Sequence, residues 1–242
     1  MLSDRPVLSM AKTNWRSCAV GFASVNLSDV GKRLWLGSAF VAVMLFASVG
    51  NSEAQIIPTI VAGYSYGLTA QTSVILQGYA SRSVIENTTL EEWRRIDAVN
   101  LDGPFLGCKH AIPLIAKAGG GAIVNISSVA GLIGARDSAA YCASKGGVRL
   151  LTKSVALHCA HRKNGVRCNS IHPVYTDTPM VGQMLAEARS PEKMLEALKA
   201  MIPIGRLGTP EELAAMAVFL VSDEARFVTG AEFVFDGGYT AN

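Results

Sequence analysis

Two short apolar runs on either side of a long helical pattern constrain the fold of this chain more than any other feature. The runs are GAIVNISS (residues 121–128) and VRCNSIHP (residues 166–173), and both are typical of buried parallel strands. Between them, residues 138–161 carry a helical pattern that ends before an Asn164-Gly165 turn. Strands joined by a helix of this length pair in parallel through right-handed crossovers. The pattern therefore predicts an α/β fold.

The neighbouring segments continue this alternation. Residues 89–119 begin with Thr89 and Glu92 in capping-box spacing and then carry apolar residues at helical intervals. Pro210 stands in the first helical position behind a capping threonine, and residues 231–238 have the pattern of a last strand. These elements predict a three-layer Rossmann-like arrangement, in which helices cover both faces of a parallel sheet.

Residues 1–84 differ in character and are predicted to form an atypical N-terminal segment. Leu34–Ser52 contains no charged residue and follows Lys32-Arg33, which resembles a signal-peptide core or a membrane span. It begins late for a signal peptide, and small residues dilute its hydrophobicity, so the favoured interpretation is a buried helix or a poorly ordered stretch. Residues 56–85 contain short β-like runs.

Composition excludes several classes of function. A chain of 242 residues suits one α/β domain, and half of its residues are apolar. The net charge of +3 is spread along the chain, so no basic stripe indicates nucleic-acid binding. The five cysteines form no CxxC pair, which indicates apolar packing in a reducing compartment and neither disulfides nor a metal site. We expect a cytoplasmic protein, with membrane association through residues 34–52 as a minor alternative.

Ser128, Tyr141 and Lys145 form a candidate site for removing a proton from an alcohol. Tyr141 and Lys145 stand at i and i+4 of the predicted helix, so they share one face. Lowering a tyrosine pKa of about 10 by roughly three units needs about 4 kcal/mol, which a nearby cation can supply. Ser128 follows a strand, where ligands bind in open α/β sheets, and its hydroxyl could orient the substrate oxygen. A half-buried helix tyrosine and an ordinary turn serine are the alternative interpretations.

The runs DAVNLDG, NISSVAG and YCASK occur in this order, and each resembles a motif of the short-chain dehydrogenase/reductase family. The resemblance covers residues 85–242, the expected catalytic region, and is most similar to the hydroxysteroid and alicyclic-alcohol dehydrogenases. It implies that Asn100 holds a helix irregularity and a water in a proton relay with Lys145. Ser128, Tyr141 and Lys145 match the other catalytic positions, and Lys145 would also bind the nicotinamide ribose.

The run HPVYTDTPM resembles the family segment that flanks the nicotinamide. The resemblance implies cofactor binding by Pro173, Thr176 and Thr178, beside Tyr141 and Lys145, with Thr178 bonding the carboxamide. The chain differs from the family in two places: Val174 replaces the usual glycine, and Thr176 replaces a common aliphatic residue. The implied cofactor is NAD or NADP, with NAD slightly favoured, although no residue that selects between them can be assigned.

The glycine loop that binds pyrophosphate in this family, TGxxxGxG, is missing from its expected place. In IVAGYSYGLT, Gly63 and Gly67 have the correct interval, but too few residues separate them from VILQG for the family's intervening strands and helices. VILQGYAS is interpreted as the strand that carries the family's NNAG motif, with Gln77-Gly78 in its place. The abrupt start of the resemblance suggests a frameshift, a mis-assigned start or a gene fusion, so we predict a TGxxxGxG in another frame upstream of the codon for Ile85.

Two functions follow from this resemblance. The first is an NAD(P)-dependent oxidoreductase that transfers hydride between a nicotinamide and a secondary alcohol or ketone of cyclic or steroid-like shape, acting as a homodimer or homotetramer. The alternative is an inactive remnant that acts only as an oligomerising scaffold. Met180–Met201 is expected to form the substrate loop, because its methionines and leucines suit an apolar substrate, although packing of a lid helix on its own core explains them equally well.

Overall fold

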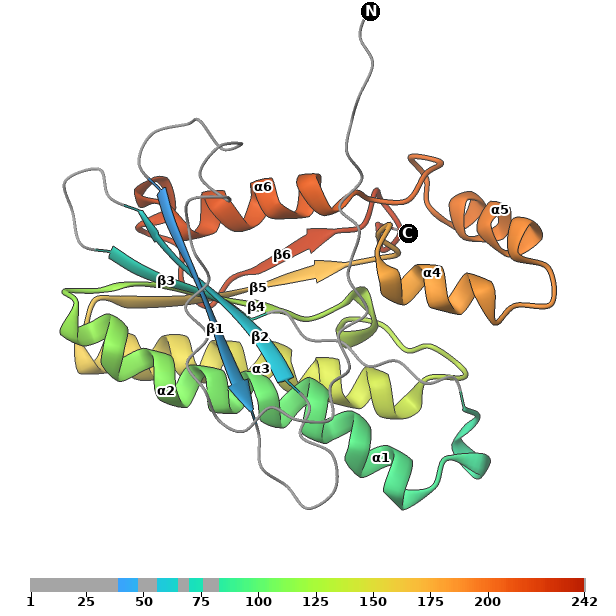
Figure 1. The fold of residues 1–242 in the computed structure, drawn as a ribbon, viewed down its shortest axis with the longest axis horizontal. Helices are drawn as coiled ribbons and strands as arrows, with labels where there is room; N and C mark the ends of the chain where they lie inside the picture. Colours follow the sequence, from blue (N-terminus) through green and yellow to red (C-terminus); the bar gives the residue numbers. More distant parts are fainter. Residues whose placement is uncertain (1–38, 48–55, 65–69, 76–82, 242) are drawn as a thin grey trace, which may run out of the picture. The chain divides into compact units, whose positions relative to one another are not determined.

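A six-stranded sheet forms the centre of the structure, which is a computed structural model describing residues 39–47, 56–64, 70–75 and 83–241 (Figure 1). The strands follow one another across the sheet in chain order. Their bounds are β1 (Ala39–Ala47), β2 (Ile56–Tyr64), β3 (Ala70–Ile75), β4 (Gly121–Ile126), β5 (Val166–Pro173) and β6 (Glu232–Phe235).

The strands from β3 to β6 pair in parallel, as the sequence predicts for an α/β fold. The β4–β5 pair runs from Gly121 opposite Val166 to Ile126 opposite Ile171, so the carboxyl ends of both strands meet at one edge. Because parallel strands need crossovers, a helical segment connects each strand of this group to the next. The Rossmann-like architecture is thereby confirmed for this part of the chain.

The first two strands differ from the rest, because β1 pairs with β2 and β2 with β3 in the antiparallel sense. Gly63 lies inside β2, opposite Gln71 of β3, so it does not belong to a turn between a strand and a helix. This position agrees with the rejection of IVAGYSYGLT as a phosphate loop. Gly67 and the Gln77-Gly78 pair lie outside the described residues.

Six α-helices and four shorter helical turns complete the described structure, and helices cover both faces of the sheet. Figure 1 shows α2 and α3 on one face and α6 on the other. The α-helices are α1 (Leu90–Asp97), α2 (Gly103–Lys117), α3 (Ala139–Arg162), α4 (Pro179–Ala186), α5 (Pro191–Met201) and α6 (Pro210–Val221). The turns are η1 (Ile85–Asn87), the π-helical η2 (Ala98–Asp102), η3 (Val129–Gly131) and η4 (Asp223–Ala225).

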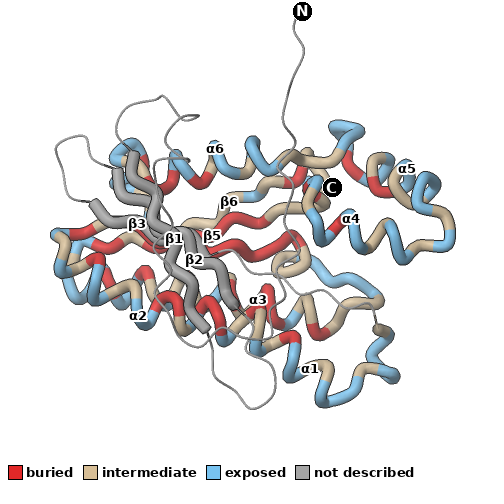
Figure 2. Tube along the Cα trace, in the orientation of Figure 1, coloured by how far each residue is buried: buried red, intermediate tan, exposed pale blue. Residues whose placement is uncertain are grey.

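Strand β4 lies between the two halves of the core and is buried along nearly its whole length (Figure 2). Ile123 packs on one face against residues of α2 and α3, such as Cys108 and Ala156. Val124 packs on the other face against Leu220 of α6. This alternation follows from the two-residue period of a strand, and burial on both faces explains the continuous apolar run.

Helix starts follow their sequence signals to different degrees. Thr209 and Glu212 form a complete capping box at α6, since each side chain bonds the backbone N–H of the other residue. At α1, the hydroxyl of Thr89 accepts from the Glu92 N–H, which is one half of the predicted box. Helix α3 ends at Arg162, and its C-cap residue Lys163 has a φ of 51°, in the left-handed region, ahead of Gly165.

The interpretation of Leu34–Ser52 as a buried helix is wrong for its central part, which forms strand β1. Residues 39–47 pair along their whole length with β2. A continuous apolar run has no periodicity that separates a buried helix from a buried strand, which explains the error. Within the ranges that the structure describes, none of the helices combines the length and apolar character needed to span a bilayer.

Candidate active site

The candidate site lies at the carboxyl ends of β4 and β5, the edge where ligands bind in open α/β sheets. Ser128 follows β4, whereas the segment after β5 carries Thr176 and Thr178. The first two turns of α3 supply Tyr141 and Lys145. Three parts of the chain, the end of β4, the segment after β5 and the start of α3, therefore carry the predicted site residues.

Ser128 contacts η3, the end of β5 and α3. Its hydroxyl accepts a hydrogen bond from the Ala130 N–H at 3.2 Å, which caps η3. The same hydroxyl lies 3.4 Å from the carbonyl oxygen of Pro173 at the end of β5, and it also hydrogen-bonds the phenol of Tyr141. The residue is 8% exposed and its backbone is extended, so its side chain is held in one direction.

Lys145 is almost completely buried, at 1% exposure. Its ammonium Nζ donates to the carbonyl oxygen of Ile126 at 3.1 Å, and it lies 5.8 Å from the centre of the Tyr141 ring. Burial disfavours the charged form and lowers the lysine pKa to about 7. Near neutral pH, roughly half of the molecules therefore carry the charge on this side chain.

The pKa of Tyr141 lies above its ordinary value, which corrects the expectation that Lys145 lowers it. Burial raises this pKa because the phenolate loses its hydration, whereas the hydrogen bond from Ser128 lowers it. The same burial removes charge from Lys145, so the cation that was expected to stabilise the phenolate is only partly present. In the ligand-free chain the phenol therefore keeps its proton at neutral pH.

Asn100 lies in the π-helical turn η2 between α1 and α2, at 0% exposure. Its amide nitrogen donates to the hydroxyl of Ser144 at 3.1 Å, and Ser144 donates to the carbonyl oxygen of Tyr141 at 2.8 Å. The helix irregularity that the family resemblance implies is present at this residue. Asn100 thereby contacts the segment of α3 that lies between Tyr141 and Lys145.

A close backbone approach fixes α3 against the end of β4. The hydroxyl of Ser127 donates to the carbonyl oxygen of Lys145 at 2.8 Å. Gly131 lies against the same oxygen, and a Cβ atom on Gly131 would be 2.7 Å from it. Only glycine fits there without displacing the helix that carries Tyr141 and Lys145.

We expect Gly131→Ala to destabilise the fold by about 1–3 kcal/mol, because the new methyl group would have to push α3 away from η3. The matched control is Gly134→Ala, since a Cβ atom at Gly134 meets no atom within 4 Å. Urea unfolding of both variants measures the effect. Equal unfolding free energies for the two variants would contradict the close approach.

The segment after β5 contains the predicted nicotinamide-binding residues. Thr176 is buried, and its hydroxyl donates to the Val174 carbonyl at 3.1 Å, so it stabilises its own loop. Thr178 caps α4 without a side-chain capping hydrogen bond. In the described part of the chain, Lys163 is the only non-glycine residue with positive φ. Val174 therefore adopts a backbone that does not require the glycine usual in the family.

Known proteins resemble this chain over about two thirds of its length. The NADP-dependent (R)-specific alcohol dehydrogenase of Lentilactobacillus kefiri is 44% identical over 165 residues, which cover 68% of this chain and 64% of that protein. The cyclohexanol dehydrogenase of Acinetobacter sp. (strain SE19) is 46% identical over 156 residues, 64% of this chain and 58% of that protein. The chain thus spans less than two thirds of the length of these two relatives.

Residues 71–240 match the protein-family model described as Enoyl-(Acyl carrier protein) reductase, well over half of the chain. The chain belongs to the short-chain dehydrogenase/reductase family. The match begins inside β3, upstream of residue 85, where the sequence resemblance was expected to start. A solved structure of this architecture, the ligand-free aldohexose dehydrogenase of Thermoplasma acidophilum, is 37% identical and has a TM-score of 0.65, covering 70% of this chain and 67% of that one.

In a short-chain dehydrogenase/reductase, these residues would hold the nicotinamide–ribose half of NAD(P), and the donor set fits that group. Lys145 and Tyr141 offer N–H and O–H groups for ribose hydroxyls beside the end of β4, and Thr178 offers a hydroxyl for a carboxamide after β5. The pyrophosphate half of the cofactor needs a strand that leads through a glycine turn into a helix. Among the described residues before 85, which form strands β1 to β3, no such unit is found. The fit therefore extends to one half of the cofactor.

Sequence reasoning missed several residues of this short-chain dehydrogenase/reductase site. His172 contacts the backbone of Ser128, and Ser144 joins Asn100 to α3. Tyr175 lies near enough to Tyr141 to raise its pKa. The available signal was a polar residue within a buried strand: His172 stands in VRCNSIHP, and a buried polar side chain needs a hydrogen-bond partner.

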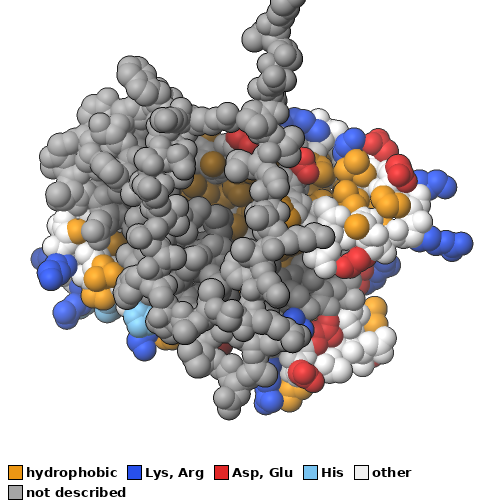
Figure 3. Space-filling view, in the orientation of Figure 1, with side chains coloured by type: hydrophobic (Ala, Val, Ile, Leu, Met, Phe, Trp, Pro, Cys, Tyr) orange, Lys and Arg blue, Asp and Glu red, His pale blue; other side chains and the backbone are white. Residues whose placement is uncertain are grey.

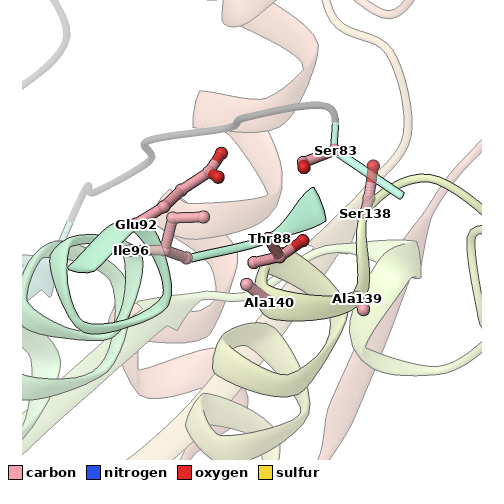
Figure 4. Close-up of a pocket in the computed structure, with 7 residues that line it drawn as sticks. All are labelled: Ser83, Thr88, Glu92, Ile96, Ser138, Ala139 and Ala140. Carbon is pink, nitrogen blue, oxygen red and sulfur yellow. The ribbon is translucent and has the colours of Figure 1, made fainter. Parts of the chain in front are cut away.

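A small pocket lies beside the site at the start of α3, and Figure 4 shows Thr88, Glu92 and Ser138 among its lining residues. Ser83 is joined to the loop that precedes α3, because its N–H donates to the carbonyl of Asp137 at 3.0 Å. None of Asn100, Ser128, Tyr141 and Lys145 lines this pocket. We interpret it as a packing gap between η1, α1 and the start of α3.

We expect Ser128→Ala to raise the pKa of the Tyr141 phenol further, because the Ser128 hydrogen bond is the contact that opposes the effect of burial. Nuclear magnetic resonance of ring-labelled tyrosine would follow this titration, with Tyr141→Phe identifying the signal. An unchanged Tyr141 titration in Ser128→Ala would show that the two hydroxyls are not hydrogen-bonded in solution.

Proposed function

We propose that this chain is an NAD(P)-dependent oxidoreductase that interconverts a secondary alcohol and a ketone. The observation that carries the proposal is the convergence of the Ser128 hydroxyl, the Tyr141 phenol and the Lys145 amine at the carboxyl ends of β4 and β5. The two named relatives are dehydrogenases of alcohols, which supports the reaction class.

In the proposed oxidation, Ser128 orients the substrate hydroxyl by a hydrogen bond, and Tyr141 removes its proton. Bound NAD(P)⁺ would supply the acceptor for the hydride that leaves the carbinol carbon, and its positive charge would favour the phenolate. Lys145 assists while it is protonated, because a cation 5.8 Å from the ring centre stabilises negative charge on the phenol. Asn100 supports this arrangement through Ser144, which keeps the first turns of α3 in place.

The substrate that we propose is an apolar cyclic alcohol. Within the expected substrate loop, Val181 and Leu198 are buried, which supports packing of α4 and α5 on their own core. Met180 and Met201 are instead 38% and 45% exposed. Hydrophobic side chains gather in the part of the surface where α4 and α5 lie, at the upper right of Figure 3. Exposed methionines suit an adaptable apolar binding surface, and one relative acts on cyclohexanol by name.

The choice between NAD and NADP, the oligomeric state and the location are predictions. NAD remains slightly favoured as the cofactor, and the NADP-dependent relative from Lentilactobacillus kefiri makes NADP the alternative. A homodimer or homotetramer is supported by exposed apolar residues on α3: Leu150 and Leu157 are 65% and 73% exposed and lie two helical turns apart on one face. We also keep the prediction of a cytoplasmic location.

Turnover of cyclohexanol with NAD⁺ and with NADP⁺, followed by the absorbance of the reduced nicotinamide, tests the proposal. We expect turnover with at least one cofactor, and we expect cyclic secondary alcohols to be better substrates than primary alcohols. No turnover of any secondary alcohol in either direction, in a chain that is folded by circular dichroism, would favour the inactive scaffold instead.

A further inference from the structure

His172 occupies a fully buried position in β5, one residue before the strand ends. Its ring nitrogen Nδ1 lies 3.1 Å from the carbonyl oxygen of Ser128, on the neighbouring strand's extension. Its other nitrogen, Nε2, lies 2.9 Å from the hydroxyl oxygen of Ser170, two residues earlier on β5. Both ring nitrogens are therefore used, and one of them contacts the residue that is proposed to orient the substrate.

These two contacts select one form of the ring. A carbonyl oxygen only accepts hydrogen bonds, so Nδ1 must carry the proton that it donates to Ser128. In the neutral ring, Nε2 then accepts from the Ser170 hydroxyl, which can donate. Burial favours the neutral ring by lowering its pKa, and the charged groups that act on it are Glu232 of β6 together with Arg149 and Lys145 of α3.

The Ser128 carbonyl accepts two hydrogen bonds, one from His172 and one from the Gly131 N–H at 2.9 Å. The second bond closes η3, whereas the first bond ties the same peptide group to β5. Ser128 has extended backbone angles between these two anchors, and its hydroxyl points to Pro173 and Tyr141. The direction of the hydroxyl therefore depends on a peptide group that His172 holds from the neighbouring strand.

We propose that His172 is a positioning residue: its neutral Nδ1–H form holds the Ser128 carbonyl and thereby keeps the Ser128 hydroxyl directed at Tyr141. The catalytic consequence rests on the proposed function, but the structural part does not. His172 acts here through Ser128 and touches no reacting atom.

Two substitutions separate the roles of the two ring nitrogens. In His172→Asn, the side-chain amide nitrogen can take the place of Nδ1 and donate to the Ser128 carbonyl. In His172→Gln, the longer amide reaches the place of Nε2 and so retains the contact with Ser170 instead. If the Ser128 contact matters, Asn preserves the function of the site and Gln does not, although both variants bury an amide of similar polarity.

The first test is a double-mutant cycle with Ser128→Ala, measured as kcat with saturating cofactor and alcohol. We expect His172→Gln to lower kcat about tenfold or more in the wild-type background, with little change in the KM for cofactor. In the Ser128→Ala background the same change should have little further effect, because the hydroxyl to be positioned is gone. Equal losses in the two backgrounds, or equal activity of the Asn and Gln variants, would overturn the proposal.

The second test needs no activity. Nitrogen-15 resonances of labelled histidine report the tautomer, and we expect the proton of His172 on Nδ1 in the folded chain. The Tyr141 titration should move upward in His172→Gln, by the same amount as in Ser128→Ala, and should stay near its wild-type position in His172→Asn. An Nε2–H tautomer, or a Tyr141 titration indifferent to His172→Gln, refutes the positioning role. If the wild-type chain oxidises no alcohol while these signals behave as expected, the proposed function fails and the positioning contact stands.

Discussion

We expect replacement of Tyr141 by Phe to lower turnover of a secondary alcohol by about 10²–10⁴-fold, the range typical of removing a general acid–base group. The phenol is the hydrogen-bond partner of Ser128 and lies beside Lys145, so it is the proposed proton acceptor. The phenylalanine ring keeps the apolar part of the side chain. We therefore expect the unfolding free energy and the affinity for reduced cofactor to change much less than kcat.

A steady-state assay of purified variants measures this effect. The matched control is Tyr239→Phe, a change of the same kind in the segment that follows β6, and this variant should retain its activity. Turnover by Tyr141→Phe at the wild-type rate would remove Tyr141 from the mechanism. A loss of activity in Tyr239→Phe as large as in Tyr141→Phe would show that the assay reports general damage to the fold.

We expect replacement of Lys145 by Met to abolish the proposed activity and at the same time to stabilise the fold near neutral pH. The lysine is 1% exposed, and its pKa in the folded chain is about 7 against an ordinary value of 10.5. An apolar side chain of similar length removes the cost of burying a charge. It also leaves the Ile126 carbonyl without its 3.1 Å donor, which offsets part of the gain.

The dependence on pH has a definite sign. Between the folded pKa of about 7 and the ordinary value of 10.5, the unfolded chain binds more protons at Lys145 than the folded chain does. The free energy of unfolding of the wild type therefore rises with pH across this window. From about pH 7 to about pH 9, the wild type should gain about 2 kcal/mol relative to Lys145→Met.

Urea unfolding of the wild type and the variant at these two pH values measures the difference, in which the other titrating groups cancel. The matched control is Lys153→Met, two turns further along α3, where the side chain is 42% exposed and pairs with Glu232. This control removes an exposed lysine from the same helix, so it tests whether the pH-dependent difference belongs to the buried position. If the difference in unfolding free energy between the wild type and Lys145→Met were the same at about pH 7 and at about pH 9, the buried lysine would keep its charge across this range.

The sequence was sufficient to predict the parallel part of the fold, because its signals are local and strong. The runs that form β4 and β5 are apolar over a strand's length, and the pattern of α3 is too long for any element but a helix. The spacing from Ser128 to Tyr141 and Lys145 predicted their proximity because it also depends only on local elements. One strand end and one helix face bring these three side chains together once the crossover is formed.

Other features depend on tertiary structure that no local pattern records. The apolar run of β1 lacks a period, so only its pairing with β2 distinguishes a strand from a helix. The raised pKa of Tyr141 and the lowered pKa of Lys145 arise from burial, and spacing along a helix carries no information on burial. His172 was missed because its partner Ser128 belongs to another part of the chain, the turn that follows β4.

The central claim, that the Ser128–Tyr141–Lys145 site uses a nicotinamide cofactor, is tested most directly by titrating the purified chain with NADH and with NADPH and following the nicotinamide fluorescence. The account predicts saturable binding at micromolar concentrations for at least one of them, in the range usual for such ligands. No binding of either cofactor at millimolar concentration would contradict the account, and the convergence of these three residues would then be a relic of the family fold.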